Sequence, residues 1–284
     1  MKLFSAYSGT PGSGHRLTGL SRFTELLERD FKRLYLVNLL TLLLCLPYLL
    51  GAAYAVLSSS LLVMLAAGIL GGALAGPAIA CLYDAVLRSL RDAKGSISEN
   101  YRRAWTQNAR SAVLPGIIFG TVLGIDLFMF ALFLWASSAP GIGTVLIYIL
   151  GLLLVFLIMT IFWPLLVLFD QPLRDRLRNC LLFSVKYFWK MLGCALLQLI
   201  YWAVFIVLLP WSSVILLLTG FWFIIFLTCF LLYDTLNETF SIEEKIAQAY
   251  PEQVPFYEDD ETWLKRKMIS EDGPKPERKD DEEE

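Results

Sequence analysis

Residues 34–83 read LYLVNLLTLLLCLPYLLGAAYAVLSSSLLVMLAAGILGGALAGPAIACLY and contain no Asp, Glu, Lys or Arg. A helix needs about 20 apolar residues to cross roughly 30 Å of hydrocarbon, so this stretch is long enough for two crossings. Residues 191–233 are also free of charge, and residues 111–169 contain only Asp126. The three stretches predict an all-α membrane protein with six transmembrane helices arranged as three hairpins.

The charges of the chain divide at residue 240. Residues 1–240 carry 17 basic and 11 acidic side chains, a net charge of +6, whereas residues 241–284 carry 7 basic and 15 acidic ones, a net charge of −8. We therefore expect a flexible leader over 1–16, a six-helix transmembrane domain over 17–240 and an acidic, largely disordered cytoplasmic tail over 241–284.

Short turns divide each apolar stretch, and basic residues give the orientation. The expected spans are 34–57, 61–83, 112–136, 143–169, 191–209 and 212–233. Lys and Arg occur before, between and after the apolar stretches, and none lies in the three short turns. The positive-inside rule then places both termini and both long loops in the cytoplasm.

A basic segment with helical periodicity precedes each predicted hairpin. The segments cover residues 23–34, 97–110 and 173–190, where apolar residues recur every three or four positions among Arg and Lys. Such segments are typical of amphipathic helices in the cytoplasmic interface, with basic side chains that reach anionic lipid head groups.

The second span of each predicted hairpin ends with the same pattern of Leu, an aromatic residue and Asp. The aromatic and acidic residues are Tyr83 and Asp84, Phe169 and Asp170, and Tyr233 and Asp234. Arg88 and Arg174 follow the first two Asp residues by four positions, a spacing that lets the charges meet on one helix face. The pattern indicates either an interfacial aromatic belt with solvated charges, or a threefold repeat of interfacial helix and hairpin around a cytoplasmic-facing cavity.

Asp126 is the one charged residue in the apolar stretches. A carboxylate near the middle of a span costs at least about 2.5–3.5 kcal/mol, so it should face protein or water, or be protonated. Asn38 and Gln198, with Tyr201 and Thr160, are candidate hydrogen-bond partners. Together Asp126, Asn38 and Gln198 form a candidate intramembrane polar site, either a packing feature or a site that binds protons or solute.

Two glycine stripes predict close helix packing. In each stripe a glycine recurs every four residues: Gly68, Gly72 and Gly76 form one stripe, and Gly116, Gly120 and Gly124 form the other. Glycines at this spacing let helix backbones approach closely in a membrane, either within one chain or between two copies.

Catalytic motifs are missing from the sequence. The one histidine is His15, and there is no GxSxG, Walker A or HExxH motif. The five cysteines form no CxxC pair, which favours free thiols in the spans. We expect no enzyme activity, no metal, no cofactor and no nucleic-acid partner.

Several short motifs resemble those of the YesL-like family of bacterial integral membrane proteins, a domain of unknown function. They are Val37-Asn38-Leu39-Leu40, Leu46-Pro47, Gly76-Pro77-Ala78 with Leu82-Tyr83, and the set Tyr101, Trp105 and Asn108. The similarity covers residues 31–235 and is strongest over 31–116, while residues 58–76 and the acidic tail depart from it. The resemblance implies a bacterial plasma (inner) membrane protein that accompanies carbohydrate-uptake systems, and it carries over no catalytic or ligand residues.

Three functions are consistent with these features. The first is a non-enzymatic accessory or assembly component of carbohydrate uptake, whose partner is a sugar ABC-transport permease or a second copy of itself. The second is an autonomous small-solute or proton-coupled transporter or channel that uses Asp126. The third is the transmembrane domain of an ABC system, in which loop 84–115 would carry the coupling helix.

Overall fold

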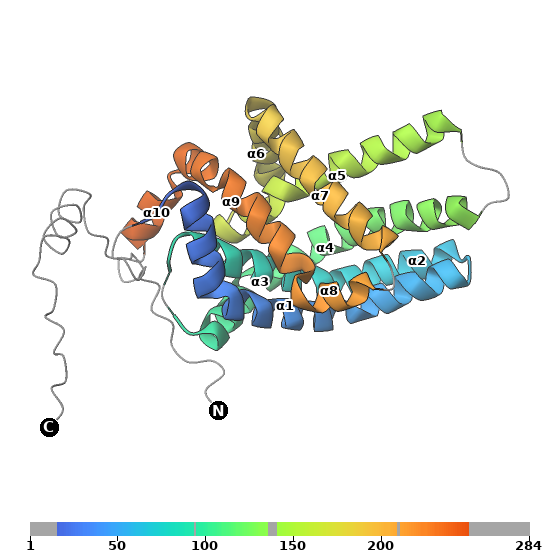
Figure 1. The fold of residues 1–284 in the computed structure, drawn as a ribbon, viewed down its shortest axis with the longest axis horizontal. Coiled ribbons are helices and arrows are strands. Elements are labelled where there is room, and N and C mark those ends of the chain that lie inside the picture. Colours follow the sequence, from blue (N-terminus) through green and yellow to red (C-terminus); the bar gives the residue numbers. More distant parts are fainter. Residues whose placement is uncertain (1–15, 94, 136–140, 209–210, 250–284) are drawn as a thin grey trace, which may run out of the picture.

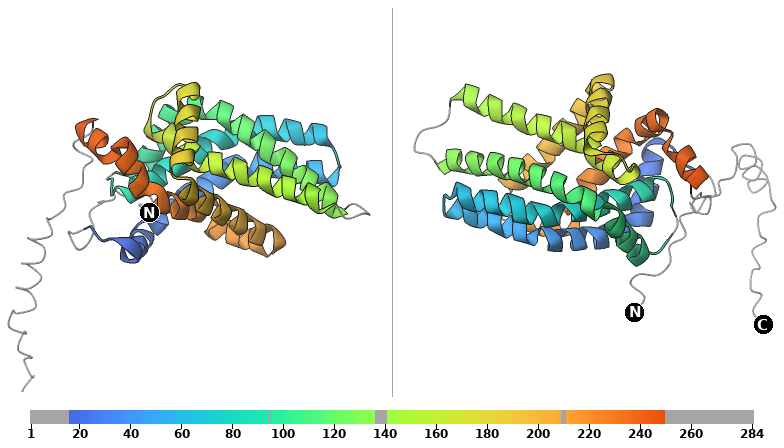
Figure 2. Two further views of the ribbon diagram at one scale, coloured as in Figure 1. Left: turned by 90° about the horizontal axis from the view of Figure 1, so that it is seen from above. Right: turned by 180° about the vertical axis from the view of Figure 1, so that it is seen from behind.

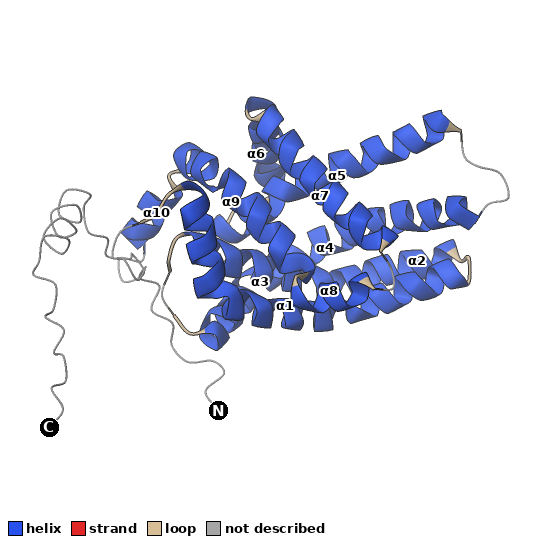
Figure 3. Cartoon of the chain, viewed as in Figure 1, coloured by secondary structure: helices blue, strands red, loops and turns tan. Residues whose placement is uncertain are grey.

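The structure, a computed structural model, describes residues 16–249 except 94, 136–140 and 209–210. These residues form helices and no strand (Figures 1 and 3). In chain order the elements are α1 Gly19–Leu57, α2 Leu61–Ala66, the π-helical turn η1 Ala67–Gly71, α3 Gly72–Leu90, α4 Ile97–Trp135, α5 Ile142–Leu168, α6 Leu173–Lys186, α7 Phe188–Val207, α8 Ser212–Leu218, α9 Gly220–Phe240 and α10 Ile242–Ala249.

Six helical segments are long and apolar enough to cross a membrane. They are Gly19–Leu57, Leu61–Leu90, Ile97–Phe133, Ile142–Leu168, Phe188–Val207 and Gly220–Phe240. The chain is therefore a multi-pass membrane protein, and the predicted number of spans is confirmed.

Two of the three predicted interfacial helices are not separate elements. Residues 23–34 and 97–110 form the N-terminal parts of α1 and α4, each a continuous helix of 39 residues. At about 1.5 Å per residue each is roughly 58 Å long, nearly twice the hydrocarbon thickness. No Gly or Pro separates the basic segment from the apolar one in either helix, and Pro115 lies inside α4.

The third predicted interfacial segment does form a helix of its own. α6 ends at Lys186, the backbone of Tyr187 leaves the helical region, and α7 begins at Phe188. In each view α6 runs steeply across the direction of α5 and projects from the side of the bundle (Figure 2).

The two glycine stripes face each other and form a seam between η1–α3 and α4. A Cβ atom at Gly76 would lie 2.3 Å from the Ala112 carbonyl oxygen and 2.8 Å from the Gly116 Cα. A Cβ atom at Gly116 would lie 2.4 Å from the Gly72 carbonyl oxygen. The backbones of the two helices thus touch directly, and no side chain larger than hydrogen fits between them.

Around Gly71, Gly120 and Gly124 the seam also contacts α1, through Tyr48. Gly68 meets Thr121, and Gly120 meets Gly72, while Gly124 lies against Met64 and Tyr48. The hydroxyl of Tyr48 donates a hydrogen bond of 3.0 Å to the Gly120 carbonyl oxygen. Both predicted stripes therefore pack within the chain.

An aromatic core lies where α3, α5 and α9 meet. Its largest fully buried side chains are Trp163, Trp222, Phe162 and Phe226, and the ring of Tyr83 stacks on Trp163 at 6.3 Å. Parts of α5, α7 and α8 expose large apolar side chains instead, as expected of surfaces that face lipid or another membrane protein.

Replacing Gly76 with alanine should destabilise the fold, because the added methyl group overlaps the Ala112 carbonyl oxygen. Overpacking of this kind costs about 1–3 kcal/mol, and we expect a lower unfolding temperature for the protein in detergent. Gly151→Ala is the matched control, since a Cβ there meets nothing within 4 Å. Equal stability of the two variants would contradict the seam.

Candidate functional site

The three residues of the predicted polar site lie in different surroundings, and no hydrogen bond joins any two of them. Asn38 contacts the start of α9, Gln198 contacts α5, and Asp126 stands apart on α4. The structure thus divides the predicted site.

Asn38 is fully buried on α1 and caps another helix. Its Oδ1 accepts hydrogen bonds from the backbone N–H groups of Phe221, at 3.0 Å, and Trp222, at 3.3 Å. The first N–H groups of a helix have no partner within it, and a side-chain oxygen normally satisfies them from the preceding residue. Here the neighbouring span supplies that oxygen.

The cap is needed because the sixth span is broken. Sequence analysis predicted one helix over 212–233, but α8 ends at Leu218 and α9 begins at Gly220. Gly220 has φ +33° and packs so tightly against Asn38 that a Cβ would lie 2.7 Å from the amide. Tyr201 on α7 also supports the break, since its hydroxyl donates to the Gly220 carbonyl oxygen at 2.8 Å.

Gln198 links α7 to α5. Its Nε2 donates to Thr160 Oγ1 at 2.5 Å, and the Thr160 hydroxyl donates to the Phe156 carbonyl oxygen at 2.6 Å. Four polar side chains therefore join α1, α9, α7 and α5: Asn38, Tyr201, Gln198 and Thr160.

Asp126 uses none of the partners that the sequence suggested. It is partly exposed on α4 and makes no hydrogen bond or ion pair with any residue that the structure describes. It lies about 200° around the helix from Gly124, which faces Met64 and Tyr48, so it points away from the glycine seam.

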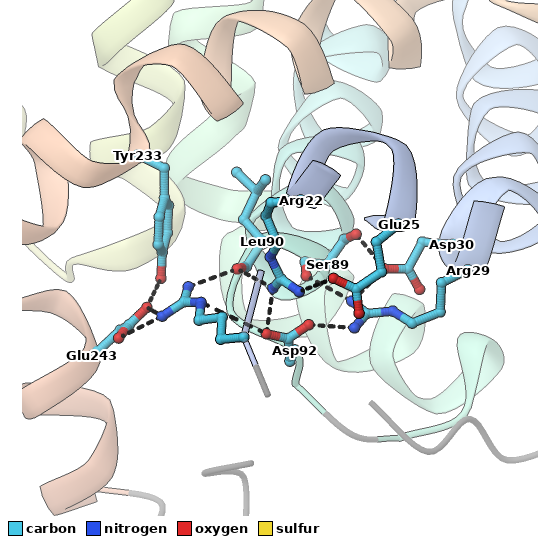
Figure 4. A network of polar contacts seen from close by, with 10 residues as sticks. Arg22, Glu25, Arg29, Asp30, Ser89, Leu90, Asp92, Tyr233 and Glu243 are labelled. Atoms are coloured by element: carbon cyan, nitrogen blue, oxygen red, sulfur yellow. Dashed lines mark hydrogen bonds and ion pairs between the residues drawn. The ribbon is translucent and has the colours of Figure 1, made fainter. Parts of the chain in front are cut away.

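An ion network joins charged residues that lie in sequence outside the charge-free parts of the spans (Figure 4). Its centre is Asp92, a fully buried residue with φ +57° in the loop after α3. Arg22 donates to one carboxylate oxygen of Asp92 and Arg29 to the other. Burial raises the pKa of Asp92, and the two guanidinium groups oppose that rise.

Asp30 and the end of α3 extend the network. Arg29 donates to Asp30 at 3.0 Å, and the Ser89 hydroxyl donates to the same carboxylate. The Leu90 carbonyl oxygen, unpartnered within its helix, accepts from Arg22 at 3.4 Å. The N-terminal part of α1 is thereby fixed to the C-terminal end of α3.

The network also joins the two ends of the described chain. Arg16 donates to the Leu90 carbonyl oxygen at 3.1 Å and pairs with Glu243 on α10 at 2.9 Å. The Tyr233 hydroxyl donates to Glu243 at 2.9 Å. Residues 242–249, part of the predicted acidic tail, are thus helical and anchored, whereas the tail from 250 lies outside the described residues.

A second buried group of charges lies beside the network. Arg88 pairs with Asp84 at 2.8 Å, as the four-residue spacing predicted, and lies 3.5 Å from Asn100 Oδ1. Burial and the nearby Arg88 guanidinium lower the pKa of Arg91 to about 10. Arg33, Asp84, Asn100 and Tyr101 line a cavity here that is about the size of one water molecule.

The three predicted span ends differ in structure. No ion pair joins Asp170 to Arg174, because α5 ends at Leu168 and Pro172 precedes α6, so the two residues do not share a helix. Phe169 packs on Phe240, at 5.5 Å between ring centroids, and Asp234 is exposed on α9. The ion pair predicted from the four-residue spacing is therefore confirmed for Asp84 and Arg88 and wrong for Asp170 and Arg174.

Within the described residues no group of three or more His, Cys, Asp or Glu side chains could hold a metal ion. The five cysteines are buried free thiols. Sequence reasoning missed the role of Asp92, although Arg22 and Arg29 are seven positions apart on one face of a helix and so indicated a shared partner.

Replacing Asn38 with leucine should weaken the start of α9, because two N–H groups lose their acceptor in an apolar setting. Loss of a helix cap costs about 0.5–2 kcal/mol, and thermal unfolding in detergent measures it. Tyr201→Phe removes a single hydrogen bond at the same break and should have a smaller effect. Unchanged stability of Asn38→Leu would refute the capping role.

Replacing Asp92 with asparagine should be more damaging, since two buried guanidinium groups lose their counter-charge. Breaking a buried pair in this way costs about 3–5 kcal/mol. We expect a large fall in the unfolding temperature, while Asp175→Asn, on the exposed side of α6, should leave it unchanged. A mild effect at Asp92 would mean that the network contributes little to stability.

Comparison with known proteins gave no match to a protein-family model, to a curated protein or to a solved structure.

Proposed function

We propose that this protein is a non-enzymatic accessory or assembly subunit of a solute-uptake system in a bacterial plasma membrane, with both termini in the cytoplasm. The observation that carries the proposal is Asp126, an intramembrane carboxylate without a partner in the described chain. Acidic residues inside membranes characteristically pair with a group on a neighbouring helix. A second subunit can supply that group.

The surroundings of Asp126 support this proposal. Ile118, Val122 and Phe130 lie at four-residue intervals along the same side of α4 and are all exposed. Asp126 is therefore a single polar point on an otherwise apolar helix face. The glycine seam holds α4 rigidly, so this face is presented in one orientation, as an assembly contact requires.

The resemblance to YesL-like proteins supports carbohydrate as the solute and a sugar ABC-transport permease as the partner. A second copy of this chain is the other partner that such a face fits. We also propose that the spans are arranged as three hairpins. Packing of α1 on α3, α4 on α5 and α7 on α9 supports that arrangement. The threefold repeat remains a hypothesis, which the differing span ends do not favour.

The broken sixth span favours a second candidate function, an autonomous transporter. Transporters of several folds bind solutes where a membrane helix is interrupted. A cavity of about 300 Å³ lies between α7, α8 and α9 beside this break. Its lining is apolar apart from Tyr201 and Ser212, whose hydroxyls already donate within the chain. In this function the break, rather than Asp126, forms the site.

Asp126→Asn tests the leading proposal. The variant should have the abundance and the unfolding temperature of the wild type. After crosslinking in native membranes, the amount of the membrane subunit that co-purifies with it should fall at least about tenfold relative to the wild type. A charge pair inside a membrane that loses one partner should weaken by this order. Asp234→Asn, which removes an exposed carboxylate at the inner end of α9, is the control and should retain the subunit.

Two results would decide against the leading proposal. One is an unchanged set of co-purifying subunits in Asp126→Asn. The other is solute flux through liposomes that contain this protein alone, which would favour the transporter. Abolition of that flux by Asn38→Leu in a folded protein would place the site at the break.

A further inference from the structure

The three basic segments near the membrane surface are not equivalent. In the first segment, Arg22 and Arg29 are directed into the ion network and bind the buried carboxylate of Asp92. Their charge is neutralised within the protein. In α6, by contrast, Arg174 and Arg178 are exposed and make no ion pair with any described residue.

One face of α6 is fixed to the bundle. Arg176, Cys180 and Phe183 are buried there. The Arg176 guanidinium lies 5.7 Å from the centre of the Phe162 ring and donates to the Gln171 carbonyl oxygen at 2.9 Å. The orientation of α6 is thereby set, and the opposite face is directed outward.

The outward face is basic at its start and apolar at its end. Arg174 and Arg178 are followed on the same side by Leu181 and Val185, because these positions are three or four residues apart. Val185 is 77% exposed, and Trp189, at the start of α7, is 80% exposed. Asp175, the acidic residue of α6, lies about 100° around the helix from Arg174.

The position of α6 matches this division of side chains. It follows the C-terminal end of α5 and lies across the direction of the spans (Figures 1 and 2). The charge-free helix α5 ends just before α6, and the charge-free stretch of α7 begins at residue 191, so α6 is expected at the level where the hydrocarbon meets the head groups. Exposed apolar side chains of this size are stable next to acyl chains, and arginines at the same level meet phosphate.

We propose that this outward face binds an acidic phospholipid of the inner leaflet. The face comprises Arg174, Arg178, Leu181, Leu182 and Val185. The two guanidinium groups bind the phosphate, and the apolar residues pack along an acyl chain. This contact is independent of the accessory role proposed above.

The test uses the full chain in mild detergent, titrated with dioleoylphosphatidylglycerol or dioleoylphosphatidylcholine and followed by native mass spectrometry. The wild type should bind the phosphatidylglycerol more tightly. The variant R174Q/R178Q should lose affinity for it by roughly 30-fold, since each basic residue near a charged lipid surface contributes about a factor of five. All substituted side chains are exposed, so an unchanged unfolding temperature verifies the fold.

Two further variants make the result specific. R102Q/R110Q removes two exposed arginines from α4 and should retain nearly full affinity. Leu181→Ser with Val185→Ser should weaken the binding of both lipids. The proposal is overturned if the wild type does not prefer phosphatidylglycerol, if both arginine variants lose affinity equally, or if a co-purifying protein covers this face.

Discussion

Direct contact between two helix backbones, at Gly72 and Gly76 on α3 and Gly116 on α4, fixes the rest of the bundle. Lipid provides no hydrophobic drive for helices to associate, so close van der Waals packing has to provide it. The seam packs α4 against α3 over much of the length of α3. Tyr48 of α1 packs against the seam and donates a hydrogen bond to Gly120. Because the seam sets the rotation of α4, it also determines that Asp126 faces away from the packed helices.

Beyond the membrane the bundle is held by charge instead. Asp92 lies in a loop where water would compete for its partners, yet it is fully buried and is bound by two arginines of α1. Arg16 and Glu243 attach α10 to the same region. The molecule thus uses glycine contacts where water is absent and buried ion pairs where water is near, and each is effective in its own setting.

The sequence predicted the features that depend on local composition and missed those that depend on distant partners. Charge-free stretches predicted six spans, and four-residue glycine spacing predicted close packing. The continuity of α1 and α4 was missed because basic residues suggest an interface even where no helix breaker separates them from the span. Asn38 was selected because it is polar, but the backbone N–H of Phe221 that donates to it lies 183 residues further along the chain. Arg22 and Asp92 are separated by 70 residues, so the common face of Arg22 and Arg29 indicated a shared partner without identifying it.

The π-helical turn Ala67–Gly71 has a consequence for how this protein should be aligned with others. A π turn accommodates one residue more than an α turn, so it acts as a one-residue insertion inside an otherwise regular span. Beyond it, every side chain is rotated by about 100° relative to an uninterrupted helix. A homologue that lacks the turn should align with a one-residue gap between 67 and 71, and an ungapped alignment would assign the seam glycines of α3 to the wrong face.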